Sequence, residues 1–228
     1  MDEHTLVIYV ASFTKSGGSW LVWMLVDLLT DPDGYCDLME KDKLDRIVYK
    51  TEQPMHSTNY DLQIIRHPLD ICCSSWNYLK LTDRANITQH DYYDSFIDSG
   101  GKIFQLERDS WKNFMAHAEP RTNITIRYED LLDDTEGTLR KIVSKSNPAR
   151  ILDRIPVVVE KYSVENCKNL EGTVKFKRPT NKKYTFFNKA DKYYYDEILT
   201  PEQIRRGHEV FGEYIEKYWP ESIKQTQT

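Results

Sequence analysis

The most constraining feature of the sequence is a strand, a short glycine turn and a helix close to its N-terminus. The apolar run from Leu6 to Ala11 is typical of a buried strand, and the run from Ser19 to Leu29 is typical of a buried helix. The turn between them contains Lys15, Gly17 and Gly18. Glycine N–H groups at a helix N-terminus bind anions, and the lysine adds a positive charge. The segment therefore indicates a phosphate site, with an ordinary strand-to-helix turn as the alternative.

Strands and helices alternate along the rest of the chain. Short β-rich runs predict strands at 47–49, 62–66 and 123–128. Helical patterns predict helices at 69–79, through 103–115, after a cap at Asp133 or Asp134, and after the capping box of Thr200 and Gln203. This alternation predicts an α/β fold of three layers, in which helices flank a central, mostly parallel sheet and ligands gather at the carboxyl ends of the strands.

Composition limits the number of domains, the ligand and the compartment. The 228 residues fit one domain spanning 1–228. A net charge of −5 argues against nucleic acid as a partner, so any anionic ligand needs a local cluster of basic side chains. The four cysteines form no C-x-x-C pair and too few histidines lie near them, which predicts no metal site and a reduced, cytoplasmic location.

No association with a membrane is expected from the sequence. The longest apolar run, from Leu21 to Leu29, is too short to span a bilayer. The acidic segment from Met1 to His4 also differs from the basic start of a signal peptide.

Three motifs follow one another at wide intervals: residues 14–20 (TKSGGSW), 66–74 (RHPLDICCS) and 128–131 (YEDL). In order and spacing they resemble PKSGTTW, RNPKDVAVS and YEDM of the sulfotransferases that use 3′-phosphoadenosine 5′-phosphosulfate (PAPS). Thr14 stands where that family has proline, and Gly18 and Ser19 replace two threonines. The resemblance covers nearly the whole chain. It implies a sheet and helices arranged as in the P-loop nucleotide hydrolases.

The resemblance also implies which residues bind PAPS and its product, 3′-phosphoadenosine 5′-phosphate (PAP). The residues implied for the 5′-phosphate are Lys15, Ser16, Gly17, Gly18 and Ser19. Arg66 and Ser74 are implied for the 3′-phosphate and Tyr128 for the adenine, whereas Trp20 either faces the adenine or packs in the core.

A late segment, Asn188-Lys189-Ala190, is similar to the family's RKG segment, which closes over the 3′-phosphate. Only its lysine is retained. Asn188 can still donate a hydrogen bond, and Lys177 or Arg178 can supply the missing cation. These two basic residues belong to a Lys-rich stretch between Lys168 and Lys192, for which a solvated loop is the alternative interpretation.

The general base is predicted from a fourth segment. Residues 50–54 (KTEQP) align with the family's KTHLP, so Glu52 stands in place of the histidine. A carboxylate removes a hydroxyl proton when burial raises its pKa toward the working pH, and a carboxylate base occurs in the branch that sulfates heparan-type sugars. We therefore expect Glu52 to be the base and Lys50 a second contact to the sulfuryl group, with His56 as the rival base.

These residues suit sulfuryl transfer chemically. Charge spreads over the nonbridging oxygens and the leaving phosphate, so backbone N–H groups and Lys15 stabilise it without a metal ion. The interval between Trp20 and Lys50 is shorter than in the cytosolic enzymes that act on small molecules. An open acceptor site follows, which suits a glycan, a peptide or a polar small molecule. Composition does not indicate the oligomeric state.

Two other functions remain as alternatives to a PAPS-dependent sulfotransferase. The first is a catalytically silent relative that binds PAP, suggested by Glu52 and by the reduced RKG segment. The second is a P-loop small-molecule kinase. It is disfavoured because Lys15 precedes the glycines and no G-x-x-x-x-G-K-[ST] motif occurs.

Overall fold

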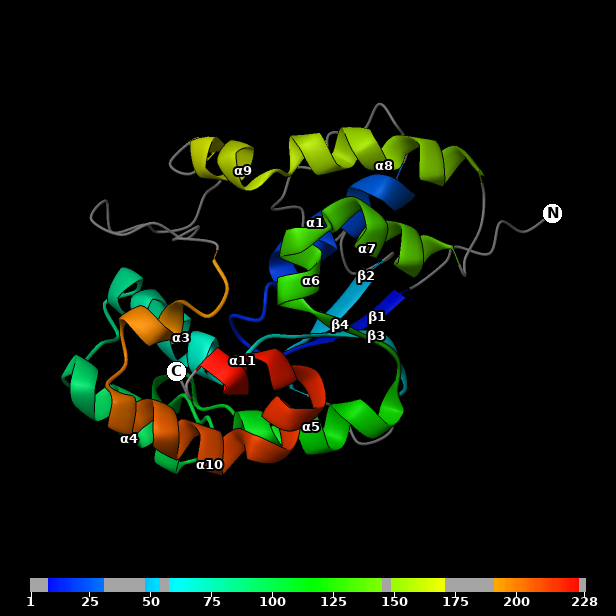
Figure 1. Cartoon of the computed structure of the whole chain (residues 1–228). Coiled ribbons are helices and arrows are strands. Elements are labelled where there is room, and N and C mark those ends of the chain that lie inside the picture. The colour runs from blue at the N-terminus through cyan, green and yellow to red at the C-terminus, as the bar shows by residue number, and fades with distance from the viewer. Residues whose placement is uncertain (1–7, 31–47, 54–57, 145–148, 171–190, 226–228) are drawn as a thin grey trace.

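Within the residues that the structure describes, a four-stranded parallel sheet forms the centre of the molecule (Figure 1). The computed structural model describes residues 8–30, 48–53, 58–144, 149–170 and 191–225. The strand order is β2-β1-β3-β4, and the strands are β1 (Ile8–Ser12), β2 (Val48–Thr51), β3 (Tyr60–Ile65) and β4 (Thr122–Arg127). Every neighbouring pair is parallel, which confirms the predicted sheet.

The strand order places a crevice between β1 and β3. The chain leaves β1 toward β2 on one side, and it leaves β3 toward β4 on the other. Val10 pairs with Leu62 in the register that joins β1 and β3. Ligands of open α/β sheets bind where the connections diverge in this way, outside the carboxyl ends of the strands. The loop after β1 and the residues after β3 meet at this point.

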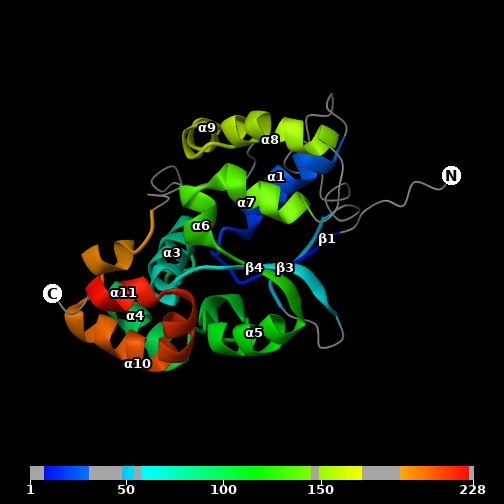
Figure 2. The ribbon, with the colours of Figure 1, turned by 45° about the vertical axis from the view of Figure 1, so that its right-hand side comes forward.

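Helices cover both faces of the sheet, as the three-layer prediction requires (Figures 1 and 2). The first face carries α1 (Gly18–Leu29), α6 (Tyr128–Asp133), α7 (Thr135–Val143), α8 (Ala149–Lys161) and α9 (Val164–Leu170). The second carries α3 (Pro68–Leu81), α4 (Gln89–Asp98), α5 (Trp111–Ala118), α10 (Pro201–Tyr218) and α11 (Pro220–Gln225). Short 3₁₀ turns are η1 (Phe104–Leu106), η2 (Glu119–Arg121) and η3 (Tyr194–Glu197).

Successive strand side chains enter two separate cores. Val10 belongs to the buried cluster that contains Leu21 and Leu25 of α1, whereas the next residue, Ala11, belongs to the cluster on the opposite face that contains Trp111. This alternation is the two-residue period of a strand. Both faces of β1 are therefore buried, which explains why its sequence is continuously apolar rather than alternating.

A buried carboxylate ties α1 to α8. Asp27, the charged residue inside the apolar run of α1, is 4% exposed. Its carboxylate forms ion pairs with Lys161 and Arg154 of α8, and Arg154 also donates to the carbonyl oxygens of Asp27, Leu28 and Thr30. Arg154 thus caps the C-terminal carbonyls of α1.

Most predicted helices are confirmed, but the helical interpretation of 103–115 is wrong. The structure has the turn η1 and then a separate helix, α5. Glu107 adopts a left-handed φ of 51°, which ends η1, and Ser110 restarts the chain as a cap by accepting from Asn113 N at 3.2 Å. The predicted cap at Asp134 and the capping box of Thr200 and Gln203 are both present.

Within the described ranges, none of the helices combines the length and the apolar character needed to cross a membrane.

Candidate active site

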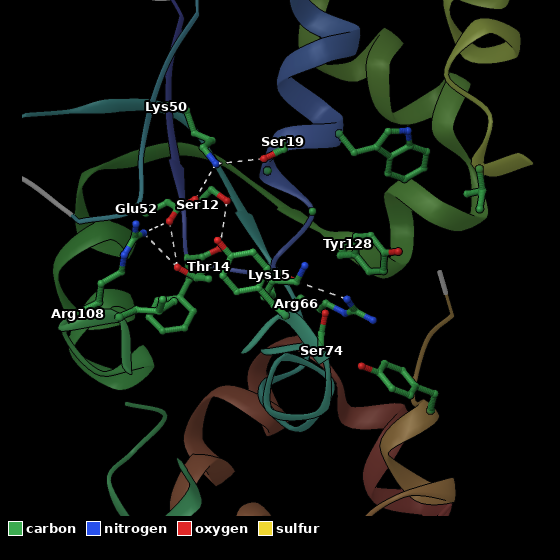
Figure 3. Close-up of a pocket in the computed structure, with 18 of the residues that line it drawn as sticks. Ser12, Thr14, Lys15, Ser19, Lys50, Glu52, Arg66, Ser74, Arg108 and Tyr128 are labelled. Carbon is green, nitrogen blue, oxygen red and sulfur yellow. Dashed lines mark hydrogen bonds and ion pairs between the residues drawn. The ribbon is translucent and has the colours of Figure 1, made fainter. Parts of the chain in front are cut away.

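A cleft lies at the carboxyl ends of β1 and β3 (Figure 3). Most residues predicted for the site line it: Lys15, Gly17, Gly18, Ser19, Trp20, Lys50, Glu52, Arg66, Ser74 and Tyr128. Ser16 is buried within the same loop. The remaining predicted residues, His56, Lys177, Arg178, Asn188, Lys189 and Ala190, lie outside the described residues. Segments far apart in the sequence therefore meet in one cleft.

The loop after β1 has a backbone that depends on its sequence. Ser16 N donates to Phe13 O at 3.1 Å and closes the first turn. Lys15 has a φ of 69° and Gly17 a φ of 84°, both in the left-handed region. Such a φ costs a non-glycine residue about 1–2 kcal/mol, so the turn holds Lys15 in a strained conformation. Backbone strain of this kind is typical of functional loops.

The two glycines leave no room for side chains. A Cβ atom on Gly17 would overlap the ring of Tyr128, and one on Gly18 would overlap Oγ of Ser12. Gly17 is also the N-cap of α1, where it offers no side chain to the first turn of N–H groups. Those N–H groups border the cleft, where they form a positively polarised edge.

Arg66 follows β3 and lies between two aromatic rings. Its guanidinium carbon is 4.3 Å from the ring centre of Tyr128 and 5.5 Å from that of Tyr194. Nη2 donates to the carbonyl of Asp191 at 3.0 Å, while the buried Nε has no partner in the part of the chain that the structure describes. Burial lowers the pKa of Arg66, but nearby Asp70 and other acidic groups outweigh it and raise the pKa overall.

Two buried carboxylates, Asp70 and Glu129, lie near Arg66 and raise its pKa. Asp70 accepts from the backbone N–H groups of Tyr193 at 2.8 Å and Tyr195 at 3.2 Å, which holds η3 against α3. Burial raises the pKa of Asp70 to about 7, although Arg66 acts in the opposite direction. Glu129 accepts from His67 N at 3.0 Å and from Trp219 Nε1 at 2.8 Å, and burial raises its pKa also.

Trp20 packs in the core and also lines the cleft. Its side chain is 7% exposed, and Nε1 donates to the carbonyl of Tyr162 at 2.8 Å. The same ring meets Tyr128 edge-on, with ring centres 6.3 Å apart, and borders the cleft. Trp20 is therefore a core residue with one edge toward the cleft.

Glu52 is surrounded by donors on the other side of the cleft. Lys50 Nζ donates to Oε1 at 2.8 Å, Thr14 Oγ1 donates to Oε2 at 3.0 Å, and Arg108 forms an ion pair with Oε2. Lys50 Nζ also lies 3.3 Å from Ser19 Oγ. Lys50 therefore connects Glu52 to the first turn of α1.

These contacts divide the cleft into two parts (Figure 3). We call Ser16, Gly17, Gly18, Arg66, Ser74 and Tyr128 the loop half. Thr14, Lys50, Glu52 and Arg108 form the glutamate half. Lys15 lies between the two groups in Figure 3, with its ammonium 5.1 Å from the ring centre of Tyr78.

Sequence reasoning missed Arg84, Arg108 and Tyr194, which also border the cleft. Arg108 reaches Thr14 across 94 positions in sequence. The surrounding sequence, Glu107-Arg108-Asp109, resembles any charged surface loop, so no local pattern marks this arginine.

The described residues offer no evident set of ligands for a metal ion. Among the described residues, no group of three or more His, Cys, Asp or Glu side chains is placed to hold a metal ion.

Comparison with known proteins gives one family. The model of the sulfotransferase domain family matches residues 54–219. No match is found among curated proteins.

Solved structures share the fold. Mouse sulfotransferase SULT7A1 complexed with PAP has a TM-score of 0.67 and 19% identity, and the match covers 95% of this chain and 86% of that one. Retinol dehydratase in complex with androsterone and inactive cofactor PAP has a TM-score of 0.64 and 14% identity, covering 92% and 80%. Retinol dehydratase in a complex with retinol and PAP also has a TM-score of 0.64 and 14% identity, covering 92% and 81%.

Proposed function

The chain belongs to the sulfotransferase domain family, and we propose that it transfers a sulfuryl group from PAPS to a hydroxyl or amine of an acceptor. The observation that carries this proposal is that two sets of cationic and N–H or O–H groups suited to anions line one cleft. Lys15 and the N-terminus of α1 form the first, and Arg66 with Ser74 forms the second. PAPS has anionic groups at both its 5′ and 3′ positions. A nucleoside triphosphate has only one such end.

The loop half contains buried polar atoms that the phosphate oxygens of such a nucleotide would satisfy. Ser16 Oγ and Arg66 Nε are buried and have no partner within the described ranges. A buried donor without an acceptor costs about 1–3 kcal/mol, which phosphate oxygens would relieve. The absence of side chains at Gly17 and Gly18 leaves the helix N-terminus open to the same ligand.

In this proposal each residue of the loop half has one task. The first-turn N–H groups of α1 and Ser16 to Ser19 hold the 5′-phosphate, while Arg66 and Ser74 hold the 3′-phosphate. Tyr128 and the edge of Trp20 contact the adenine. The solved structures with PAP and the same fold support a nucleotide in this cleft. PAPS supplies the sulfuryl group when it is bound.

The glutamate half would carry the chemistry at the acceptor. Glu52 accepts the proton of the attacking hydroxyl, and Lys15 stabilises the charge that develops on the leaving 5′-phosphate. Lys50, which donates to both Glu52 and Ser19, would contact the sulfuryl group. No metal ion is required for these steps, because preorganised cations and helix N–H groups do the stabilising.

One observation favours the silent alternative, in which the chain binds PAP without turnover. Glu52 already has an ion pair with Lys50 and another with Arg108. Cations stabilise the charged form of a carboxylate and make it a weaker base. An acceptor must therefore change these contacts if Glu52 is to act.

The experiment is incubation of the full chain with ³⁵S-labelled PAPS and a panel of glycans, peptides and polar small molecules, together with calorimetric titration of PAP. Transfer of label to an acceptor supports the sulfotransferase. Tight PAP binding without transfer to any member of the panel supports the silent alternative. Failure to bind PAP would contradict both functions.

A further inference from the structure

Building on the proposed function, we propose that the acceptor carries an anionic group near its reacting hydroxyl, and that Arg108 binds this anion by leaving Glu52. The anion would be a carboxylate, sulfate or phosphate. Arg108 would thus select the acceptor and release the base in one movement.

The first observation is the occupancy of the Glu52 carboxylate. Oε2 accepts from Thr14 and is paired with Arg108, and Oε1 is paired with Lys50. Each carboxylate oxygen has about two lone-pair positions, so both positions of Oε2 are taken and Oε1 keeps one. Glu52 can approach a hydroxyl at Oε2 only if one of these donors moves away.

Arg108 is the donor best able to move. Lys50 belongs to β2, where it pairs with Val10 of the central strand, and its ammonium is also held at Ser19. Arg108 belongs instead to the irregular segment between η1 and α5, just after the left-handed Glu107. About a third of its side chain is exposed. Its neighbour Asp109 is directed toward α5, where it accepts from Asn113 Nδ2 at 2.8 Å.

A second arginine makes the same surface suitable for an anion. Arg84 follows α3, borders the cleft and is exposed. Its guanidinium has no hydrogen bond or ion pair within the described part of the chain. The segment that contains it lies against η1, because Gln105 Nε2 donates to Asn86 Oδ1 at 3.3 Å. Arginine side chains bind carboxylate, sulfate and phosphate groups through two parallel hydrogen bonds.

The charges of the cleft support the same conclusion. Lys15, Lys50, Arg66, Arg84 and Arg108 line it, with Glu52 as the carboxylate among the lining residues. The whole chain has a net charge of −5, so this concentration of cations is local. The proposed nucleotide uses Lys15 and Arg66. Arg84 and Arg108 remain for an anion on the acceptor.

The step balances without another reactant. The acceptor oxygen bonds to sulfur, and the bond between sulfur and the bridging oxygen breaks with its electron pair left on the 5′-phosphate beside Lys15. The acceptor proton passes to Glu52. A neutral acceptor would leave Arg108 on Glu52, and the same step would be slower because the base is occupied.

The test compares two acid and neutral pairs as acceptors with ³⁵S-labelled PAPS: p-nitrophenyl β-D-glucuronide against the glucoside, and N-acetyltyrosine against N-acetyltyrosinamide. We expect kcat/KM to favour the acid of at least one pair by about tenfold or more. Arg108→Gln should lower kcat/KM for that acid about tenfold and raise it for the neutral partner, because Glu52 is released. Arg84→Gln should lower the value for the acid alone. The matched control is Arg140→Gln, because Arg140 is an exposed arginine that is paired with Glu136 on α7.

Opposite effects on the two acceptors distinguish this proposal from a structural role of Arg108, which would lower both rates. Equal losses on acid and neutral acceptors would overturn it, as would the absence of an acid preference in both pairs of the unmodified protein. If neither pair is sulfated, calorimetric binding of the same four compounds to the PAP-loaded protein decides by the same criterion. Failure to bind PAP at all would contradict the proposed function instead.

Discussion

The two halves of the cleft are built in different ways. The loop half comes from residues at the carboxyl ends of the adjacent strands β1, β3 and β4, and Arg66 and Tyr128 are 7% and 6% exposed. The glutamate half combines Thr14, which follows β1, and the end of β2 with the segment before α5, and the side chains of Glu52 and Arg108 are 26% and 32% exposed. Among the described residues, the loop half has buried polar atoms without partners, whereas the carboxylate of Glu52 is paired with cations of the protein itself. Under the proposed function, the loop half is therefore preorganised for the nucleotide, and the glutamate half must rearrange to act.

Substitution of Glu52 should nearly abolish turnover in the glutamate half and leave nucleotide binding in the loop half intact. Glu52→Gln removes the proposed base, and we expect kcat to fall about 10²–10⁴-fold, the usual contribution of general base catalysis. PAP binding should be retained because Arg66 and the glycine loop are unchanged. Stopped-time assays with labelled PAPS and calorimetry measure both quantities, with Glu136→Gln on α7 as the control carboxylate. An active Glu52→Gln protein would move the base to His56 or another residue.

Substitution of Arg66 tests the loop half alone. Arg66→Ala should weaken PAP binding by about 1.5–3 kcal/mol, the range for a hydrogen bond to a charged group. Adenosine 5′-phosphate, which lacks the 3′-phosphate, should bind almost as before. Arg66→Lys keeps the charge but loses the stacking on Tyr128, so it should give an intermediate loss for PAP. Equal losses for both nucleotides would contradict a role at the 3′-phosphate.

Much of the loop half was predictable from sequence, and the reason is physical. Phosphate loops form from consecutive residues between a strand and a helix, so Ser16, Gly17 and Gly18 are recognisable in one short segment. Capping residues such as Asp134 are equally local. Arg108 is not, because its contact with Thr14 depends on how β1 and the segment before α5 are placed in space.

The errors of the fold prediction also arise where the backbone departs from a regular pattern. Apolar spacing from Ile103 to Met115 favours one helix, but the left-handed Glu107 interrupts it. The role of Asp70 was likewise only partly predictable. Its place in the first turn of α3 suits the helix dipole, yet its hydrogen bonds go to the backbone of Tyr193 and Tyr195.

A pH series tests the raised pKa of Asp70, the buried carboxylate near Arg66 of the loop half. Burial raises the pKa of Asp70 from the usual 3.8 to about 7, so the folded protein holds this proton more tightly than the unfolded chain. The contribution of Asp70 to stability is complete below about pH 4 and is lost as the pH rises through 7. Between pH 5 and 8 the free energy of unfolding should fall on the order of 2 kcal/mol more in the unmodified protein than in Asp70→Asn. Urea denaturation at each pH measures the free energy of unfolding. An equal fall with pH in the two proteins would contradict a raised pKa for buried Asp70.

The smallest expected effect concerns the contacts within the glutamate half. Thr14 Oγ1 donates to Glu52 and accepts from Arg108 Nη1 at 3.1 Å. Thr14→Val should change the activation free energy of turnover by about 0.5–1.5 kcal/mol, the range for one neutral hydrogen bond. The affinity for PAP should be unchanged. Steady-state kinetics and calorimetry on the same preparation measure both. A matching loss of PAP affinity would show that the two halves are not separable.

The central claim is that this cleft moves a sulfuryl group from PAPS to an acceptor. The most direct test is a single-turnover reaction with ³⁵S-labelled PAPS and the full panel of glycans, peptides and polar small molecules. We expect label in an acceptor, with release of PAP in equal amount, and the loss of both in Glu52→Gln while PAP still binds. Label that remains in PAPS, or that transfers equally well in Glu52→Gln, would contradict it.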